Sequence, residues 1–253
     1  MLIDTHAHLD FKDYRKDLDE IINRAKKNQV SKIITIGASL EGSKKGLELA
    51  KKYKEIYVAI GIHPESVKEL NSDVLDLFRK FSKEKKVVAI GEIGLDYYIE
   101  NYSKDEQIKI FKDQLDLAFE LKLPVILHIR NAFEDAMSIL DKYDWHKNKG
   151  VIHCYLSSYK KVKSIIDKGF LISFTGIVTY DEGIQKAVKA TPIEKIMIET
   201  DCPFLAPEPY RGERNESSYV KYVAEKIASI KGTSFEEVAE ITTKNAIEFF
   251  NLK

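Results

Sequence analysis

Short apolar runs alternate with longer amphipathic stretches from one end of this chain to the other. Each apolar run is nearly continuous, as is typical of strands that are buried on both faces of a parallel sheet. The eight runs are LIDTH (2–6), KIITIG (32–37), IYVAIGIH (56–63), VVAIGE (87–92), PVILHIR (124–130), GVIHC (150–154), GFLISFT (169–175) and KIMIETD (195–201). Eight strands alternating with helices within 253 residues predict an α/β fold, the (β/α)8 or TIM barrel.

Two of the amphipathic stretches place apolar residues at the i, i+3, i+4, i+7 spacing of a helix face. They are 14–29, with Leu18, Ile21, Ile22 and Ala25, and 104–122, with Ile108, Phe111, Leu115, Ala118 and Leu121. Near the C-terminus, Ser234 and Glu237 have the spacing of a capping box ahead of a final stretch that ends at Phe249-Phe250. The sequence therefore predicts an extra C-terminal helix beyond the barrel.

A doubly wound open sheet is the alternative architecture for this alternation. That fold usually carries a glycine-rich phosphate-binding turn after its first strand. Here the corresponding turn is THAHLDFKD (5–13), which contains no glycine. No linker, low-complexity tract or internal repeat divides the chain, so we expect residues 1–253 to form a single domain.

Charge and apolar content limit the partners of the chain. Lysine plus arginine and aspartate plus glutamate both total 40, so the formal net charge is zero. The broad basic field of a protein that coats nucleic acid is therefore absent, but a compact cationic site for a few phosphates is compatible with this charge.

No apolar segment approaches the roughly 18 residues of a membrane span, and the N-terminus does not have the pattern of a secretory signal. Cys154 and Cys202 form no C-x-x-C pair and predict no disulfide. We expect a monomeric cytoplasmic protein with no membrane partner.

Two histidines, His6 and His8, lie one residue apart at the end of the first apolar run. Because successive strand side chains point to opposite faces, an i, i+2 pair aims both rings to the same side. Two imidazoles in this arrangement can bind one metal ion. Taken alone, however, the pair is more typical of two hydrogen-bonded histidines at a strand end.

Other residues of metal-ligand type also fall at strand ends, where the chemistry of a TIM barrel gathers. Glu92 ends the fourth run and Asp201 ends the eighth. Of the six histidines, only His146 lies away from a strand end. The other histidines are His6, His8, His63, His128 and His153.

Four imidazoles and two carboxylates are a suitable ligand set for two divalent metal ions, Mg²⁺, Mn²⁺ or Zn²⁺. The predicted ligands are His6, His8, Glu92, His128, His153 and Asp201. Two ions about 3.5–4 Å apart can activate one water between them and stabilise both ends of a displacement. In this hypothesis Glu92 bridges the ions, while Asp201 binds one ion and takes the proton from the attacking water.

Three segments of the chain carry polar residues of the predicted site: LIDTHAHLD (2–10), PVILHIRNAFED (124–135) and IEKIMIETDCP (193–203). They resemble the three signature segments of the TatD family of metal-dependent hydrolases, also called TatD-like DNases. GIHPE, GEIGLDYY and PYRGERNESSYV also resemble landmarks of this family. The resemblance implies a barrel of the amidohydrolase-like metal hydrolases with the same six ligands. Some members of the family are Mg²⁺-dependent nucleases that trim DNA or RNA from the 3′ end.

The chain departs from the family pattern in two places. It has HCYLSSY (153–159) where a short HCFSG-like turn is usual, and NESSYV (215–220) where NEPAYV is common. Neither departure touches a predicted ligand. The first can reshape the loop beside the metals, so it bears on the choice of substrate.

Three further residues are predicted to contact substrate. Arg130 lies on the His128 side of its strand, and Arg211 lies in the loop after the eighth run. Either guanidinium suits a phosphate oxygen, and the alternative for each is an ordinary salt bridge. His63 is predicted as a substrate contact, with a structural role as its alternative. Glu199, on the same strand face as Asp201, is predicted to be hydrogen-bonded behind the ligands.

The sequence predicts a metal-dependent hydrolase that acts on ester bonds. From the resemblance we expect a 3′–5′ DNase or exonuclease that acts on ends of single-stranded DNA or RNA. In this hypothesis His6, His8 and Asp201 hold one ion, His128 and His153 hold the other, and Glu92 bridges them.

Two alternatives stay open at this point. One is a small-molecule amide, lactone or phosphoester hydrolase. Several such barrels bridge their metals with a carbamylated lysine on the fourth strand, where this chain has Glu92. The other is a non-catalytic metal-binding scaffold, and the complete set of ligands counts against it.

Overall fold

The computed structural model describes residues 1–98 and 102–253. The chain forms two compact units. The terminal unit comprises residues 1–35 and 154–253, and the central unit comprises residues 36–153. The terminal unit is therefore assembled from the two ends of the chain.

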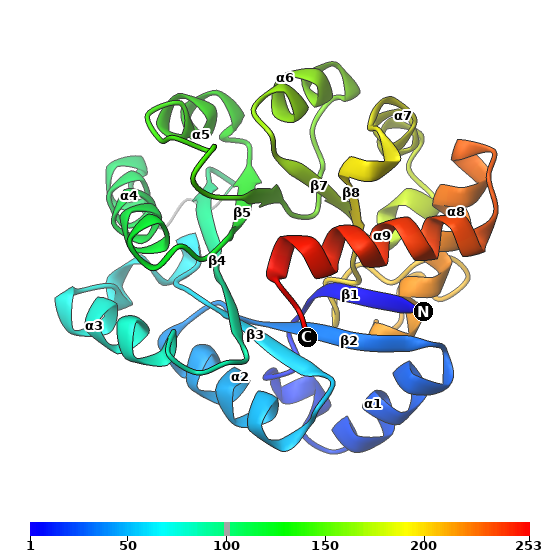
Figure 1. Cartoon of the computed structure of the whole chain (residues 1–253), viewed down its shortest axis with the longest axis horizontal. Helices are drawn as coiled ribbons and strands as arrows, with labels where there is room; N and C mark the ends of the chain where they lie inside the picture. The colour runs from blue at the N-terminus through cyan, green and yellow to red at the C-terminus, as the bar shows by residue number, and fades with distance from the viewer. Residues whose placement is uncertain (99–101) are drawn as a thin grey trace. The chain divides into compact units, whose positions relative to one another are not determined.

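The terminal unit contains the first and last elements of the chain and shares one strand with the central unit. Its strands are β1 (Leu2–Ala7), β2 (Val30–Gly37), β7 (Leu171–Phe174) and β8 (Ile196–Ile198), and its helices are α1 (Leu18–Lys27), α6 (Val162–Asp167), α7 (Glu182–Ala190), α8 (Val220–Lys231) and α9 (Phe235–Phe250). β1 pairs with β2 and β7 pairs with β8, both in parallel. The C-terminal helix α9 lies alongside β1 and contacts β1, β8 and α8 (Figure 1).

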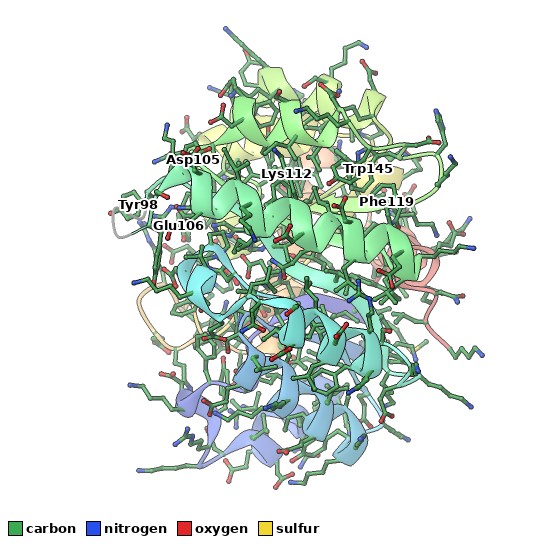
Figure 2. The ribbon with its side chains drawn as sticks, turned by 90° about the vertical axis from the view of Figure 1, so that its left-hand side faces the viewer. Tyr98, Asp105, Glu106, Lys112, Phe119 and Trp145 are labelled. Carbon is green, nitrogen blue, oxygen red and sulfur yellow. The ribbon has the colours of Figure 1, made fainter. Side chains whose placement is uncertain are left out.

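The central unit contains the middle four strands and the helices between them. Its elements are α2 (Leu40–Lys52), β3 (Ile56–Ile60), α3 (Ser72–Phe81), β4 (Val87–Asp96), α4 (Lys104–Leu121), β5 (Val125–Arg130), α5 (Phe133–Leu140) and β6 (Gly150–Ile152). β4 pairs in parallel with β3 and β5, and β5 pairs in parallel with β6. Figure 2 shows α4 lengthwise, with Asp105 and Glu106 towards one end and Phe119 beside Trp145 towards the other. The Phe119 and Trp145 ring centroids are 5.2 Å apart.

The order of the strands confirms the predicted architecture. The eight strands follow one another in the sheet in chain order, from β1 to β8. A parallel strand followed by a helix, repeated in this order, is the connectivity of a (β/α)8 barrel. Each of the eight predicted runs overlaps one of these strands. Among the described residues, no helix is long and apolar enough to cross a membrane.

The strands β3 and β8 stop before the polar residues that ended their predicted runs. β3 ends ahead of His63, because His63 and Pro64 begin a 3-10 helix in which the His63 ring accepts a hydrogen bond from the Glu65 amide at 3.1 Å. β8 ends ahead of Asp201, where the chain turns with a φ of 55°. Both residues therefore lie on the loops that follow their strands.

Two predicted helices match the structure in different degrees. The helix predicted over 14–29 begins only at the start of α1, because Tyr14 belongs to a preceding 3-10 turn and donates its hydroxyl to the Asn215 carbonyl at 2.6 Å. The predicted C-terminal helix is α9, and the Ser234 hydroxyl accepts a hydrogen bond from the Glu237 amide at 3.1 Å. The extra C-terminal helix is thus confirmed.

Gly94 allows β4 and β5 to approach closely. A Cβ atom at this position would lie 1.9 Å from the His128 carbonyl oxygen, and the φ of Gly94 is +152°. Only glycine fits such a contact at this backbone angle. The glycine in GEIGLDYY therefore lets β4 run on past Glu92 alongside β5.

Candidate metal-binding site

In the terminal unit, His6 and His8 at the end of β1 both face the carboxylate of Asp201. His6 Nε2 lies 3.5 Å and His8 Nε2 lies 3.4 Å from Asp201 Oδ1. The two imidazole centroids are 5.1 Å apart, so the i, i+2 spacing places both rings together as predicted. The Asp201 amide donates to the His6 carbonyl at 2.9 Å, and the His8 amide donates to the Cys202 carbonyl at 2.8 Å. We call His6, His8 and Asp201 the histidine–aspartate cluster.

Asp4 supports this cluster from within β1. Its buried carboxylate accepts hydrogen bonds from the Thr200 amide at 2.9 Å and from the Thr200 hydroxyl at 2.7 Å. Burial raises the pKa of Asp4 to about 7, against the opposing effect of these hydrogen bonds. Asp4 therefore ties β1 directly to the segment that carries Asp201.

In the central unit, three imidazoles surround the carboxylate of Glu92. Glu92 Oε1 lies 2.5 Å from His128 Nδ1 and 2.6 Å from His153 Nε2. It lies 3.6 Å from His63 Nε2. Glu92 belongs to β4 and His128 to β5, while His153 follows β6 and His63 follows β3. We call these four residues the glutamate cluster.

Electrostatic attraction dominates the glutamate cluster. Burial would raise the pKa of Glu92, but the surrounding imidazoles hold it well below its ordinary value. Burial would lower the pKa of His128, but the charge of Glu92 and hydrogen bonds to the Asp96 and Glu92 carboxylates raise it. Glu92 is therefore ionised, which is the form of a carboxylate that binds a metal ion.

Asp96 supports the glutamate cluster and was missing from the predicted residues. Its Oδ2 accepts a hydrogen bond from His128 Nε2 at 3.1 Å, and the residue is only 2% exposed. His128 thus presents Nδ1 to Glu92 and Nε2 to Asp96, the arrangement in which a carboxylate orients a metal-binding histidine. The sequence did contain a signal, because Asp96 follows Glu92 by four residues and strand alternation puts both on one face.

Two buried glutamines of α4 fix the backbone beside the glutamate cluster. Gln107 Oε1 accepts from the Asp96 amide at 2.8 Å, and Gln107 Nε2 donates to the Asp96 carbonyl at 2.9 Å. Gln114 makes the same pair of bonds with the backbone of Ile62, at 2.7 and 3.0 Å. Seven residues apart, the two glutamines lie on one face of the helix. They hold Asp96 and the residue that precedes His63.

The two arginines predicted to bind phosphate each stack on a tyrosine. The Arg130 guanidinium lies 3.9 Å from the centre of the Tyr98 ring and 4.0 Å from Asp96 Oδ2. The Arg211 guanidinium lies 4.1 Å from the centre of the Tyr180 ring. The salt bridge that was the alternative for Arg130 is therefore present, and phosphate binding by either arginine stays a prediction.

His63, predicted as a substrate contact, lies within the glutamate cluster itself. Its Nδ1 accepts a hydrogen bond from the Glu65 amide, and its Nε2 is directed at Glu92. This geometry suits a metal ligand as well as a substrate contact. The predicted substrate role stays a prediction.

Glu199 is hydrogen-bonded as predicted. Its carboxylate is buried in the terminal unit and accepts from the Cys154 amide at 2.6 Å and from the Ser173 hydroxyl at 2.7 Å. Cys154 and Cys202 are not joined in a disulfide in this structure. Glu199 therefore fixes the backbone at Cys154, the residue that follows the predicted ligand His153.

The donor atoms of both clusters fit divalent cations. One ligand atom from each of His63, Glu92 and His128 lies within 4.8 Å of the other two, a spacing that suits atoms bound at about 2.0–2.2 Å from one ion. In the other cluster, two imidazole nitrogens converge on one carboxylate oxygen of Asp201. Both sets combine imidazole nitrogen with carboxylate oxygen, which Zn²⁺ and Mn²⁺ accept and which Mg²⁺ binds through its oxygen atoms.

Comparisons with protein families and with known proteins all lead to the same family. The model of the family described as TatD related DNase matches residues 3–251. YabD from Bacillus subtilis, which bears the name of a metal-dependent hydrolase, is 42% identical over 254 residues that cover 100% of both chains. A Salmonella typhimurium protein named 3′-5′ ssDNA/RNA exonuclease TatD is 29% identical, and the match covers 99% of each chain.

A solved structure shows the same fold. The crystal structure of YjjV, a TatD homologue from Escherichia coli, superposes with a TM-score of 0.93 at 28% identity, covering 100% of this chain and 98% of that one. Together with the strand order, this likeness confirms the predicted α/β barrel.

Proposed function

Because the chain belongs to the TatD related DNase family and is a metal-dependent hydrolase, we propose that it cleaves phosphodiester bonds from the 3′ end of single-stranded DNA or RNA. The name of the Salmonella relative supports this substrate class, at 29% identity. The observation that carries the proposal is the glutamate cluster. An ionised, buried carboxylate with three imidazoles around it is a site for a cation that can act on a phosphate group.

Each group of residues has a role in this proposal. His6, His8 and Asp201 would hold one divalent ion, and Glu92, His128 and His153 would hold a second. When bound, such ions stabilise the negative charge that develops on the phosphate and its leaving oxygen. Asp201 accepts the proton of the attacking water. Arg130, Arg211 and His63 hold and orient the phosphate.

Digestion of labelled oligonucleotides tests the proposed activity. Single-stranded DNA and RNA labelled at the 5′ end are incubated with the protein and Mg²⁺, Mn²⁺ or Zn²⁺, and parallel reactions contain EDTA. We expect stepwise shortening from the 3′ end that EDTA abolishes. A metal-loaded protein that leaves both polymers intact would overturn the proposal and direct attention to small phosphoesters.

Substitution of Asp201 tests its assigned role. We expect Asp201→Asn to abolish hydrolysis while the circular dichroism spectrum and the melting temperature stay close to wild type, because the amide cannot accept the proton. The matched control is Asp167→Asn, which neutralises an exposed carboxylate on α6 that pairs with Lys163. An active, folded Asp201→Asn protein would show that another group is the base.

A further inference from the structure

An exposed aromatic side chain borders the histidine–aspartate cluster. Phe204 follows Asp201 by three residues and is 51% exposed. Its ring centroid lies 6.3 Å from that of His8 and 5.9 Å from that of Phe11, which in turn lies 4.9 Å from His8. We call Phe11 and Phe204 the phenylalanine pair. The two phenylalanine rings therefore form an apolar, aromatic surface next to the imidazole of His8.

The backbone holds Phe204 in this exposed position. The Phe204 amide donates to the Asp201 carbonyl at 3.1 Å, and the Phe204 carbonyl accepts from Asn215 Nδ2 at 2.6 Å. The next turn is packed tightly, since a Cβ on Gly176 would lie 2.3 Å from the Leu205 carbonyl oxygen. The exposure of the ring is thus a feature of a well-bonded loop.

We propose that Phe204 stacks on the 3′-terminal base of a single-stranded nucleic acid whose phosphodiester is held at the histidine–aspartate cluster. This inference rests on the proposed function. A base is joined to its phosphate through one sugar, so a ring that borders the ligand His8 is placed to meet the base of the nucleotide under attack. Aromatic stacking accepts any base, because every base has a π-face.

The charge of the chain makes such a local contact important. With a formal net charge of zero, the protein has no broad basic field to attract a long polyanion. Affinity for a strand end then depends on contacts close to the metal ligands. A stacking surface beside His8 supplies one that does not depend on the sequence of the substrate.

The test combines variants of Phe204 with two kinds of oligonucleotide end. One single-stranded oligonucleotide has an ordinary 3′-terminal nucleotide, and the other has a 3′-terminal residue that lacks its base. We expect Phe204→Ala to lower kcat/KM on the ordinary end by roughly 5- to 150-fold, the range for loss of one base stack. On the abasic end the same variant should match wild type, and Phe204→Trp should retain activity on both.

Controls separate stacking from general damage. Ile247→Ala removes another exposed apolar side chain, 38% exposed, from α9 and should behave as wild type on both ends. Melting temperature and Mn²⁺ affinity should be unchanged in Phe204→Ala. An equal loss on ordinary and abasic ends, or no loss on either, would overturn the inference.

A binding measurement keeps the inference separate from the proposed function. If the wild-type protein cleaves no nucleic acid, the proposed function fails, but stacking can still be measured with a 3′-terminal 2-aminopurine oligonucleotide. Quenching of its fluorescence by wild type and by Phe204→Trp, but not by Phe204→Ala, supports the inference. Equal fluorescence with all three proteins overturns it.

Discussion

At the scale of single residues, Asp96 determines how His128 is presented to Glu92. His128 Nε2 donates to Asp96 while Nδ1 faces Glu92. We expect Asp96→Asn to weaken metal binding by about 10- to 100-fold, the usual cost of losing a carboxylate that orients a ligand histidine. Isothermal titration with Mn²⁺ measures this affinity.

The control for this substitution is a carboxylate of the same unit whose hydrogen-bond partner is a tyrosine hydroxyl. Asp135 accepts a hydrogen bond from the Tyr97 hydroxyl on the surface. Asp135→Asn should bind Mn²⁺ as wild type does. Wild-type affinity in Asp96→Asn would mean that Asp96 serves only the local fold.

Residues at the end of an apolar run could be predicted from the sequence. Asp96 was missed, although its four-residue spacing from Glu92 was a signal. The apolar pattern predicts that the fourth strand ends at its first polar residue, Glu92, because a buried strand is expected to be apolar. The strand in fact continues to Asp96, since Gly94 allows close contact with the His128 backbone and the polar side chains of the strand face other polar groups. Their favourable environment comes from neighbouring strands that are distant in sequence.

At the scale of elements, α4 positions the backbone at the ends of two strands through its glutamines. We expect Gln107→Leu to lower the free energy of unfolding by about 2–5 kcal/mol, because the amide and carbonyl of Asp96 lose their partners within a buried site. Urea unfolding measures this change. It should be accompanied by weaker Mn²⁺ binding, since Asp96 contacts His128.

Lys109→Leu on the exposed face of the same helix is the control for this effect. It changes the surface of α4 and leaves both glutamines in place, so stability should change by less than about 0.5 kcal/mol. A Gln107→Leu protein as stable as Lys109→Leu would contradict the role assigned to the glutamine.

Helix α4 shows that apolar periodicity predicts where a helix lies better than it predicts which residues the helix contacts. The apolar spacing predicted the helix over 104–122, and α4 lies there. Yet Gln107 and Gln114 are fully buried, while the predicted core residue Ile108 is only partly buried. A glutamine on a buried face is stable only because a strand end offers it an amide and a carbonyl, and apolar spacing contains no information about that partner.

At the scale of the whole molecule, two distant segments of the chain build the terminal unit. Within it, Arg24 pairs with Glu216 at 2.6 Å and Arg214 pairs with Asp17 at 2.5 Å. The strand order could be predicted from eight successive runs. The grouping of residues 1–35 with residues 154–253 could not, because it depends on contacts between residues nearly 200 positions apart.

The single domain predicted for residues 1–253 can be tested by calorimetry. β2 begins in the terminal unit and ends in the central unit, so separate unfolding of the two would divide one strand. We expect one transition whose calorimetric and van't Hoff enthalpies have a ratio of about 1. Two resolved transitions would show that the units are independent domains.

The most direct test of the account is the number of divalent ions that the chain binds. We predict that titration of metal-free protein with Mn²⁺ gives two ions per chain. His8→Ala disrupts the histidine–aspartate cluster and should bind one ion. His153→Ala and Glu92→Gln disrupt the glutamate cluster and should also each bind one ion, while His146→Ala, which removes the histidine outside both clusters, should still bind two. A wild-type protein that binds fewer than two ions, or a His146→Ala protein that loses as much metal as the cluster variants, would contradict the two-ion assignment.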